Sequence, residues 1–139
     1  MMKLHITFAA AFLFLAAAAN AQIVVIANSS VSADSISKSD LVKVFTGAST
    51  RLASGARVTP ALLKEGPLHA QFASTYLGKS PIALVVIWRG LVLSGQAAMP
   101  KTFGSEVEMT AYVARTPGAI GYVGEKTPHD GVKELHVTN

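Results

Sequence analysis

Residues 105–123 read SEVEMTAYVARTPGAIGYV, and this stretch predicts a helix followed at once by a buried strand. Ser105 and Glu108 form a capping box, in which each side chain bonds a backbone N–H at the start of the helix. The Thr-Pro-Gly of residues 116–118 ends the helix, and the apolar residues 119–123 follow as a short strand. A helix that returns directly into a strand is typical of an α/β domain.

The chain on both sides continues this alternation of strands and helices. Strands are expected at 23–27, 57–63 and 132–137, and helices at 37–47, 67–78 and 81–95. The last of these segments carries Trp88 and is expected to be a largely buried helix, although its β-branched content would equally allow a strand. The sequence therefore predicts an α/β fold, with three layers if helices cover both faces of the sheet.

The composition supports a single folded domain. The chain has 139 residues, of which 50% are hydrophobic and 14% charged, and its net charge is +4. This is neither a disordered composition nor a basic nucleic-acid-binding one, so no nucleic-acid partner is expected. Cysteine is absent, which excludes disulfides, cysteine-ligated metals and thiol nucleophiles.

The N-terminus has the pattern of a secretory signal peptide. A short cationic start is followed by about 14 apolar residues, fewer than the ~20 that a membrane-spanning helix needs. Small residues at Ala19 and Ala21 predict cleavage before Gln22. We therefore expect a signal peptide at 1–21, a domain at 22–139, a periplasmic location, and no membrane insertion after cleavage.

No constellation of residues indicates an enzyme. The three histidines beyond residue 21 (His69, His129 and His136) fit no local metal or nucleophile motif, and the carboxylates are spread along the chain. We therefore predict no catalytic residue, no metal site and no cofactor.

Helix starts preceded by small polar residues are the remaining candidates for binding. They occur at Ser35, Ser37 and Ser39, at residues 64–67, and at Gly104 with Ser105. Such ends present unpaired backbone N–H groups and a partial positive charge, and can hold an oxyanion without a catalytic residue, although ordinary capping explains many of them.

Three motifs resemble the phosphate-binding proteins of bacterial phosphate-uptake ABC transporters. Residues 117–123 read PGAIGYV, which is a specific signature of that family. Residues 39–47 are similar to its L-x-x-I-F-x-G segment, and Trp88 with Ser94 and Gly95 is similar to a further stretch. The order and spacing of these motifs agree with those of the family over residues 23–123.

The resemblance implies one lobe of a type II periplasmic binding protein, because complete members of the family close two such lobes on one oxyanion. In the family an Arg precedes a turn of the type D-G-S-G-T, whose hydroxyl and N–H groups hold phosphate. The corresponding residues here are 64–69, reading KEGPLH. Lys64 replaces the Arg as a cation, the hydroxyl pair is absent, and Pro67 removes a donor.

The function predicted first is weak binding of phosphate or a similar small oxyanion by an exported domain. The candidate ligand-binding residues are Lys64, Gly66, His69, Ser29 and Ser30. Because one lobe leaves an anion half exposed, weak affinity is expected unless a homodimer or an envelope or transporter protein supplies a second wall. The alternative is a reduced family member that binds no ligand and acts as a protein-interaction module in the cell envelope.

Overall fold

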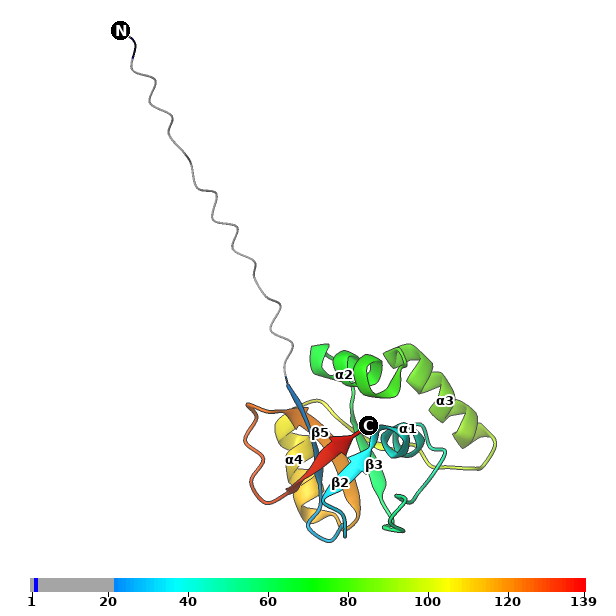
Figure 1. Ribbon diagram of the computed structural model, residues 1–139. Helices are drawn as coiled ribbons and strands as arrows, with labels where there is room; N and C mark the ends of the chain where they lie inside the picture. Colours follow the sequence, from blue (N-terminus) through cyan, green and yellow to red (C-terminus); the bar gives the residue numbers. More distant parts are fainter. Residues whose placement is uncertain (1, 3–21) are drawn as a thin grey trace.

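The structure is a computed structural model that describes Met2 and residues 22–139, so the predicted signal peptide lies almost wholly outside the described residues. Figure 1 shows strands and helices alternating along the chain. The strands are β1 (Ile23–Ala27), β2 (Ser35–Ser37), β3 (Thr59–Leu63), β4 (Lys101–Phe103), β5 (Ala119–Gly124) and β6 (Lys133–Thr138). The helices are α1 (Lys38–Phe45), α2 (Pro67–Phe72), the π-helix η1 (Ala73–Leu77), α3 (Pro81–Leu93) and α4 (Glu106–Arg115).

The strands form one sheet in the order β2-β6-β1-β5-β3-β4. β1 runs antiparallel to both of its neighbours, whereas every other adjacent pair is parallel. In the β1–β5 ladder Ile23 lies opposite Gly124, and Ala27 lies opposite Ile120. The end of β1 therefore meets the beginning of β5, at the opposite end of the sheet from the carboxyl ends of β3, β4 and β5.

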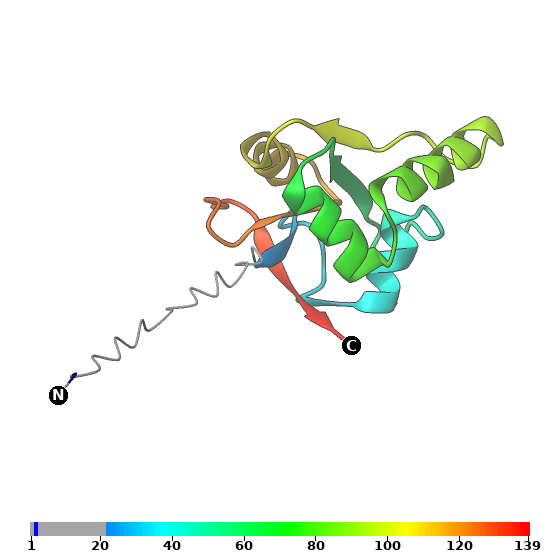
Figure 2. The ribbon, with the colours of Figure 1, turned by 90° about the horizontal axis from the view of Figure 1, so that it is seen from above.

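Helices cover both faces of this sheet. Successive residues of a strand point to opposite faces, and in β5 the Cβ position of Gly121 is directed at Met109 and Val113 of α4. The next side chain, Tyr122, stacks on Phe72 of α2 instead. The domain therefore has three layers, with α4 on one face and α1 with α2 on the other (Figures 1 and 2).

Aromatic side chains fill the centre of the layer between the sheet and α1 and α2. Phe72 stacks on Tyr122 with ring centroids 3.8 Å apart, and its ring meets Phe45 edge-on at 5.0 Å. None of these three side chains is exposed to solvent. Offset and edge-on aromatic pairs stabilise a core beyond the area they bury, so this cluster fixes α2 on the sheet.

Local chemistry explains where the helices begin. The side chains of Ser37, Ser80 and Ser105 cap α1, α3 and α4 by accepting a backbone N–H of the first turn. α2 begins differently, with Gly66 at a φ of 104° and Pro67 in the first turn, and no side chain caps it. Gly78, in the left-handed region, ends η1.

Most of the predicted elements are confirmed. The strand at 23–27, the helices beginning at Ser37, Pro67 and Ser105, and the strand from Ala119 are present. The predicted strand at 57–63 is confirmed from Thr59 onward. The structure adds three elements that the sequence did not predict, β2, β4 and the π-helical turn η1.

The predicted burial of the helix at 81–95 is wrong. α3 is a helix, but only Leu84 and Trp88 are buried in it. The indole N–H of Trp88 donates to the carbonyl of Phe45 at 2.9 Å, and this attaches α3 to α1. The remainder of the helix projects beyond the sheet (Figures 1 and 2), and its other residues are exposed or half-buried.

Candidate functional site

Three loops follow the carboxyl ends of the parallel strands β3, β4 and β5. In α/β sheets ligands bind at this edge, because the loops and the helix starts that follow the strands lie there together. The backbone N–H of Lys64, after β3, donates to the carbonyl of Phe103 at the end of β4 at 2.9 Å. Gly124, the last residue of β5, lies close to both α2 and α4. A Cβ added to this glycine would be 3.8 Å from Leu68 of α2 and 3.2 Å from the carboxylate of Glu106 of α4.

The start of α2 is the open position at this edge. The first N–H groups of a helix have no partner within the helix, and no side chain caps the N–H groups of Leu68 and His69. The carbonyl of Gly66 accepts the N–H of Ala70, which closes the first turn. Lys64 is exposed two residues before Gly66. A cation and uncapped amides therefore occur together, and both favour an anion.

The start of α4, by contrast, is capped by Ser105, and the carboxylate of Glu106 in its first turn reaches the loop after β5. Glu106 Oε1 accepts the N–H of Gly124 at 2.6 Å and the hydroxyl of Thr127 at 2.8 Å. No local sequence pattern indicates these contacts of Glu106 with the loop after β5, because Gly124 and Thr127 are 18 and 21 residues away in the chain. The negative charge of Glu106 disfavours an anion beside Gly124. The start of α2 is preceded by the exposed Lys64 and has no side-chain cap, so it is the candidate.

The imidazole of His69 lies in the interior, with 4% of the residue exposed. The phenolic oxygen of Tyr122 accepts the backbone N–H of Leu63, and its hydroxyl is also hydrogen-bonded to His69 Nδ1. The neutral imidazole can make this second bond. Burial lowers the pKa of His69, and this favours the neutral form of the ring. His69 thus contributes its backbone N–H to the start of α2, while its ring supports the core.

Ser29 and Ser30 lie at the other end of the sheet. They follow β1, which runs antiparallel to β5. The hydroxyl of Ser30 accepts the N–H of Gly118 at 3.0 Å, and its backbone N–H donates to the side chain of Asn28. The structure therefore brings Lys64, Gly66 and His69 together and separates them from these two serines.

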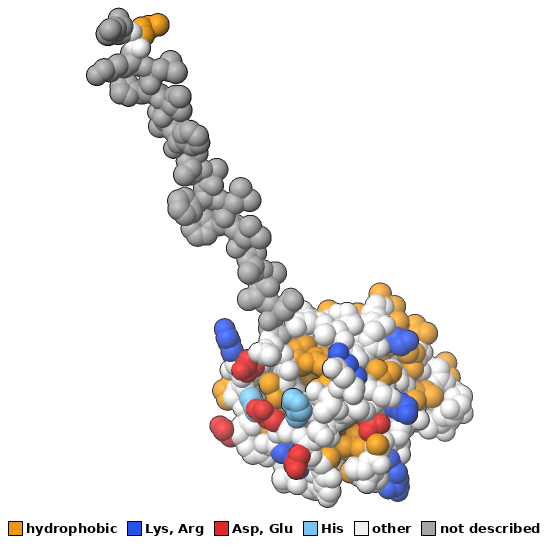
Figure 3. Space-filling view, viewed as in Figure 1, with side chains coloured by type: hydrophobic (Ala, Val, Ile, Leu, Met, Phe, Trp, Pro, Cys, Tyr) orange, Lys and Arg blue, Asp and Glu red, His pale blue; other side chains and the backbone are white. Residues whose placement is uncertain are grey.

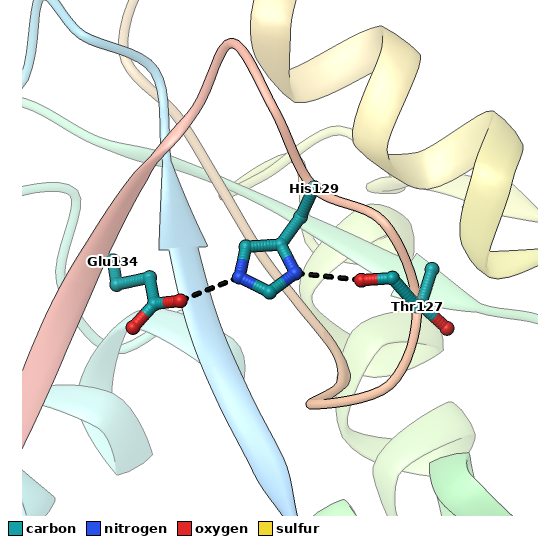
Figure 4. A network of polar contacts seen from close by, with 3 residues as sticks. All are labelled: Thr127, His129 and Glu134. Atoms are coloured by element: carbon teal, nitrogen blue, oxygen red, sulfur yellow. Dashed lines mark hydrogen bonds and ion pairs between the residues drawn. The ribbon is translucent and has the colours of Figure 1, made fainter.

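A second polar group joins the loop after β5 to β6. His129 donates from Nδ1 to the carbonyl of Thr127 at 2.6 Å and bonds Glu134 through Nε2 (Figure 4). Both ring nitrogens donate only in the protonated ring. The hydrogen bonds to Thr127 and Glu134 accordingly raise the pKa of His129 above its ordinary value of 6.5.

This raised pKa predicts how stability depends on pH. A folded-state pKa above the unfolded one stabilises the fold below about pH 6.5, and this contribution disappears as the pH rises through the raised value. We expect His129→Asn to be less stable than the wild type at pH 5.5, by under about 1 kcal/mol because the pair is partly exposed. Thermal melts at pH 5.5 and pH 9 measure this. If the wild type exceeds the variant in melting temperature by more at pH 9 than at pH 5.5, the protonated His129 does not stabilise the fold.

Solved structures of phosphate-transport proteins resemble this chain over most of the described residues. An ABC-type phosphate transport receptor from Vibrio cholerae matches with a TM-score of 0.64 and 12% identity, over 84% of this chain. A phosphate ABC transporter substrate-binding protein with bound phosphate, from Clostridium perfringens, matches with a TM-score of 0.63 and 13% identity, also over 84%. The chain has the fold of about half of such a receptor. The resemblance predicted from the PGAIGYV motif is confirmed at the level of the fold.

The chain spans less than half the length of these receptors. It covers 46% of the Vibrio protein and 45% of the Clostridium protein. PstS from Borrelia burgdorferi, at 15% identity and a TM-score of 0.53, is covered over 48%. These shares agree with the prediction of a single lobe. No family model and no curated protein matches the sequence.

Proposed function

We propose that this is an exported domain of the solute-binding type that binds phosphate or a similar small oxyanion weakly at the start of α2. The observation that carries the proposal is the uncapped start of α2 beside Lys64, at the carboxyl edge of the parallel strands. The likeness to receptors of phosphate transport, one of them with phosphate bound, supports an anion as the ligand.

The available donors account for weak binding. Lys64 supplies one charge, and the N–H groups of Leu68 and His69 supply two hydrogen bonds, while Pro67 supplies none. Lys64 and Gly66 are exposed, so water competes for the anion. We expect a dissociation constant of about 1 mM, equivalent to roughly 4 kcal/mol. A homodimer or a transporter or envelope protein would supply a second wall and raise the affinity.

The proposal includes export to the periplasm and no catalytic activity. Residues 1–21 have the composition of a signal peptide. The fold neighbours are named as receptors and a substrate-binding protein, so binding without chemistry is the expected role.

Titration calorimetry of the purified protein with phosphate, sulfate and acetate at low salt tests the proposal. We expect saturable heat with phosphate or sulfate in the millimolar range. A ligand at a hundred times its dissociation constant stabilises the fold by about 2.7 kcal/mol, so the melting temperature should rise in parallel. Neither heat nor a melting shift at these concentrations would contradict oxyanion binding.

Replacing Lys64 by alanine should weaken phosphate binding about tenfold, the effect of losing one charge-assisted hydrogen bond of roughly 1.5 kcal/mol. Lys43→Ala is the matched control, because Lys43 is also an exposed lysine but lies at the end of α1. Calorimetry of both variants gives the comparison. Equal affinities for the two variants would place the anion elsewhere.

One observation favours the alternative, a domain that binds no anion and acts in protein interaction. The carboxylate of Glu106 already occupies the N–H of Gly124 at the ligand edge. Cross-linking to an envelope protein, together with a calorimetric titration that shows no heat, would support this role over anion binding.

A further inference from the structure

The outer face of α3 is apolar and exposed. Ile82 is 78% exposed, Val86 is 62% exposed and Leu93 is 87% exposed. These positions are separated by four and seven residues, so they lie along one face of the helix. Val85, Val92 and Met99 widen the exposed apolar surface, and a shallow pocket lies among Arg89, Val92, Leu93 and Met99. We call residues 82, 85, 86, 92, 93 and 99 the α3 patch.

The orientation of α3 fixes this patch on the outside. Leu84 and Trp88 are buried on its inner side, and the Trp88 indole is hydrogen-bonded to the carbonyl of Phe45. Rotating the helix to bury Val86 would remove Trp88 from the core and break that bond. A contiguous exposed apolar surface of this kind indicates an interaction site.

The charge around the patch is positive. Arg89 is exposed within α3, and Lys79 and Lys101 lie before and after it. No aspartate or glutamate occurs between Glu65 and Glu106. Figure 3 shows hydrophobic side chains with Lys and Arg over the side of the molecule that carries α3, whereas most of the visible Asp, Glu and His side chains lie toward the opposite side. The α3 side therefore combines apolar and cationic groups.

We propose that the α3 patch docks on an anionic lipid surface, with the helix lying in the interface. Apolar residues beside cationic ones are the features of interfacial helices. α3 has 13 residues and is about 20 Å long at 1.5 Å per residue, which is shorter than the ~30 Å hydrocarbon core. Within residues 22–139 no single helix meets the length and hydropathy of a membrane span, and one bent pair, 67–77 with 81–93, meets them only together. The phenyl ring of Phe72 in that pair is buried in the core, so α3 lies on the bilayer rather than across it.

Charge and size favour lipid over a second copy of the chain. A second α3 patch would bring Arg89 toward another Arg89, with no carboxylate in residues 66–105 to pair with it. Two helices of this length contact each other over roughly 20 by 10 Å on each chain, which is small compared with the ~800 Å² that each partner of a standard interface buries. An anionic lipid surface can pair its headgroups with Arg89 and, at the same time, accept the apolar side chains of the α3 patch.

Sedimentation of the full chain with vesicles tests the proposal. One set contains phosphatidylglycerol and phosphatidylethanolamine, and the other contains phosphatidylcholine alone. We expect binding to the anionic vesicles that weakens with salt, and at least tenfold weaker binding to the neutral ones. Val86→Asp should lower binding to the anionic vesicles at least tenfold.

Val107→Asp is the matched control, because Val107 is 67% exposed on α4. α4 packs on the opposite face of the sheet from α1, the helix to which α3 is attached. Arg89→Glu and Lys43→Glu form the corresponding pair for charge. Residues 1–21 are the same in every variant, so only a loss specific to Val86→Asp and Arg89→Glu supports docking through α3. Equal binding by Val86→Asp and Val107→Asp, or no binding to anionic vesicles, overturns the proposal. A dimer of the wild-type chain that is detected by sedimentation equilibrium and is dissociated by Val86→Asp also overturns the proposal.

Discussion

Phe72→Ala is expected to lower the free energy of unfolding by about 3–5 kcal/mol, the range for removing a buried aromatic ring. Phe72 is fully buried and stacks on Tyr122 at 3.8 Å. It also meets Phe45 edge-on, so its removal leaves a cavity that two aromatic rings line. α2 would lose its main contact with the sheet. Urea unfolding followed by circular dichroism measures the change.

Tyr76→Ala provides the control for this substitution. Tyr76 follows in η1, with its ring centroid 5.7 Å from that of Phe72, and it is only partly buried. Its removal should cost clearly less than the removal of Phe72. If Phe72→Ala costs less than about 1 kcal/mol, or no more than Tyr76→Ala, the described packing of α2 on the sheet is wrong.

Gly121→Val is expected to destabilise the protein by about 3 kcal/mol, the upper part of the range for overpacking. A Cβ at position 121 would lie 2.6 Å from the sulfur of Met109 and 3.3 Å from Cγ2 of Val113. Valine adds two further methyl groups in the same direction, so α4 would have to move away from β5. Thermal and urea unfolding both report the loss.

Two further variants separate overpacking from other effects of the substitution. Gly90→Val adds the same atoms on α3, where no atom lies within 4 Å of the Cβ position and φ is not positive. It should be close to neutral. Met109→Ala combined with Gly121→Val should recover part of the lost stability, because the smaller side chain at position 109 makes room for the valine at position 121. A double variant as unstable as the sum of its single changes contradicts the close approach of α4 to β5.

The elements with strong local signals could be predicted from the sequence. α4 begins at Ser105 as its capping box indicates, and α2 begins at Pro67 after Gly66. β2 and β4 have three residues each, and Lys101–Phe103 has no alternation long enough to distinguish a strand from a loop. These strands exist because a parallel neighbour pairs with them, and that pairing depends on the tertiary fold.

The burial of α3 could not be predicted because the helix is apolar on nearly every side. A stripe of polar residues normally shows which face of a helix meets water. In α3 only Arg89 and Gly90 interrupt the apolar sequence, so no such stripe is present. Its inner face is decided by Trp88 reaching the carbonyl of Phe45. The hydrophobicity of 81–95 therefore predicted burial where the structure shows an exposed face.

The helix start at the candidate site could be predicted, whereas anion binding there stays a prediction. The local sequence around Gly66 indicated a helix beginning at Pro67, and the structure has this helix, with no side-chain cap. The direction of β1 cannot be obtained from local sequence, and β1 alone separates Ser29 and Ser30 from Lys64. The burial of the His69 ring follows from its contact with Tyr122, which is 53 residues away in the sequence.

Amide NMR of the uniformly ¹⁵N-labelled protein, titrated with phosphate, tests oxyanion binding at α2 most directly. We predict shifts that saturate in the millimolar range and centre on the amides of Lys64, Gly66, Leu68 and His69, with little change at Ser29, Ser30 and Gly118. The same shifts should weaken in Lys64→Ala. Shifts that centre on the opposite end of the sheet, or no saturable shift at all, would contradict an anion site at the start of α2.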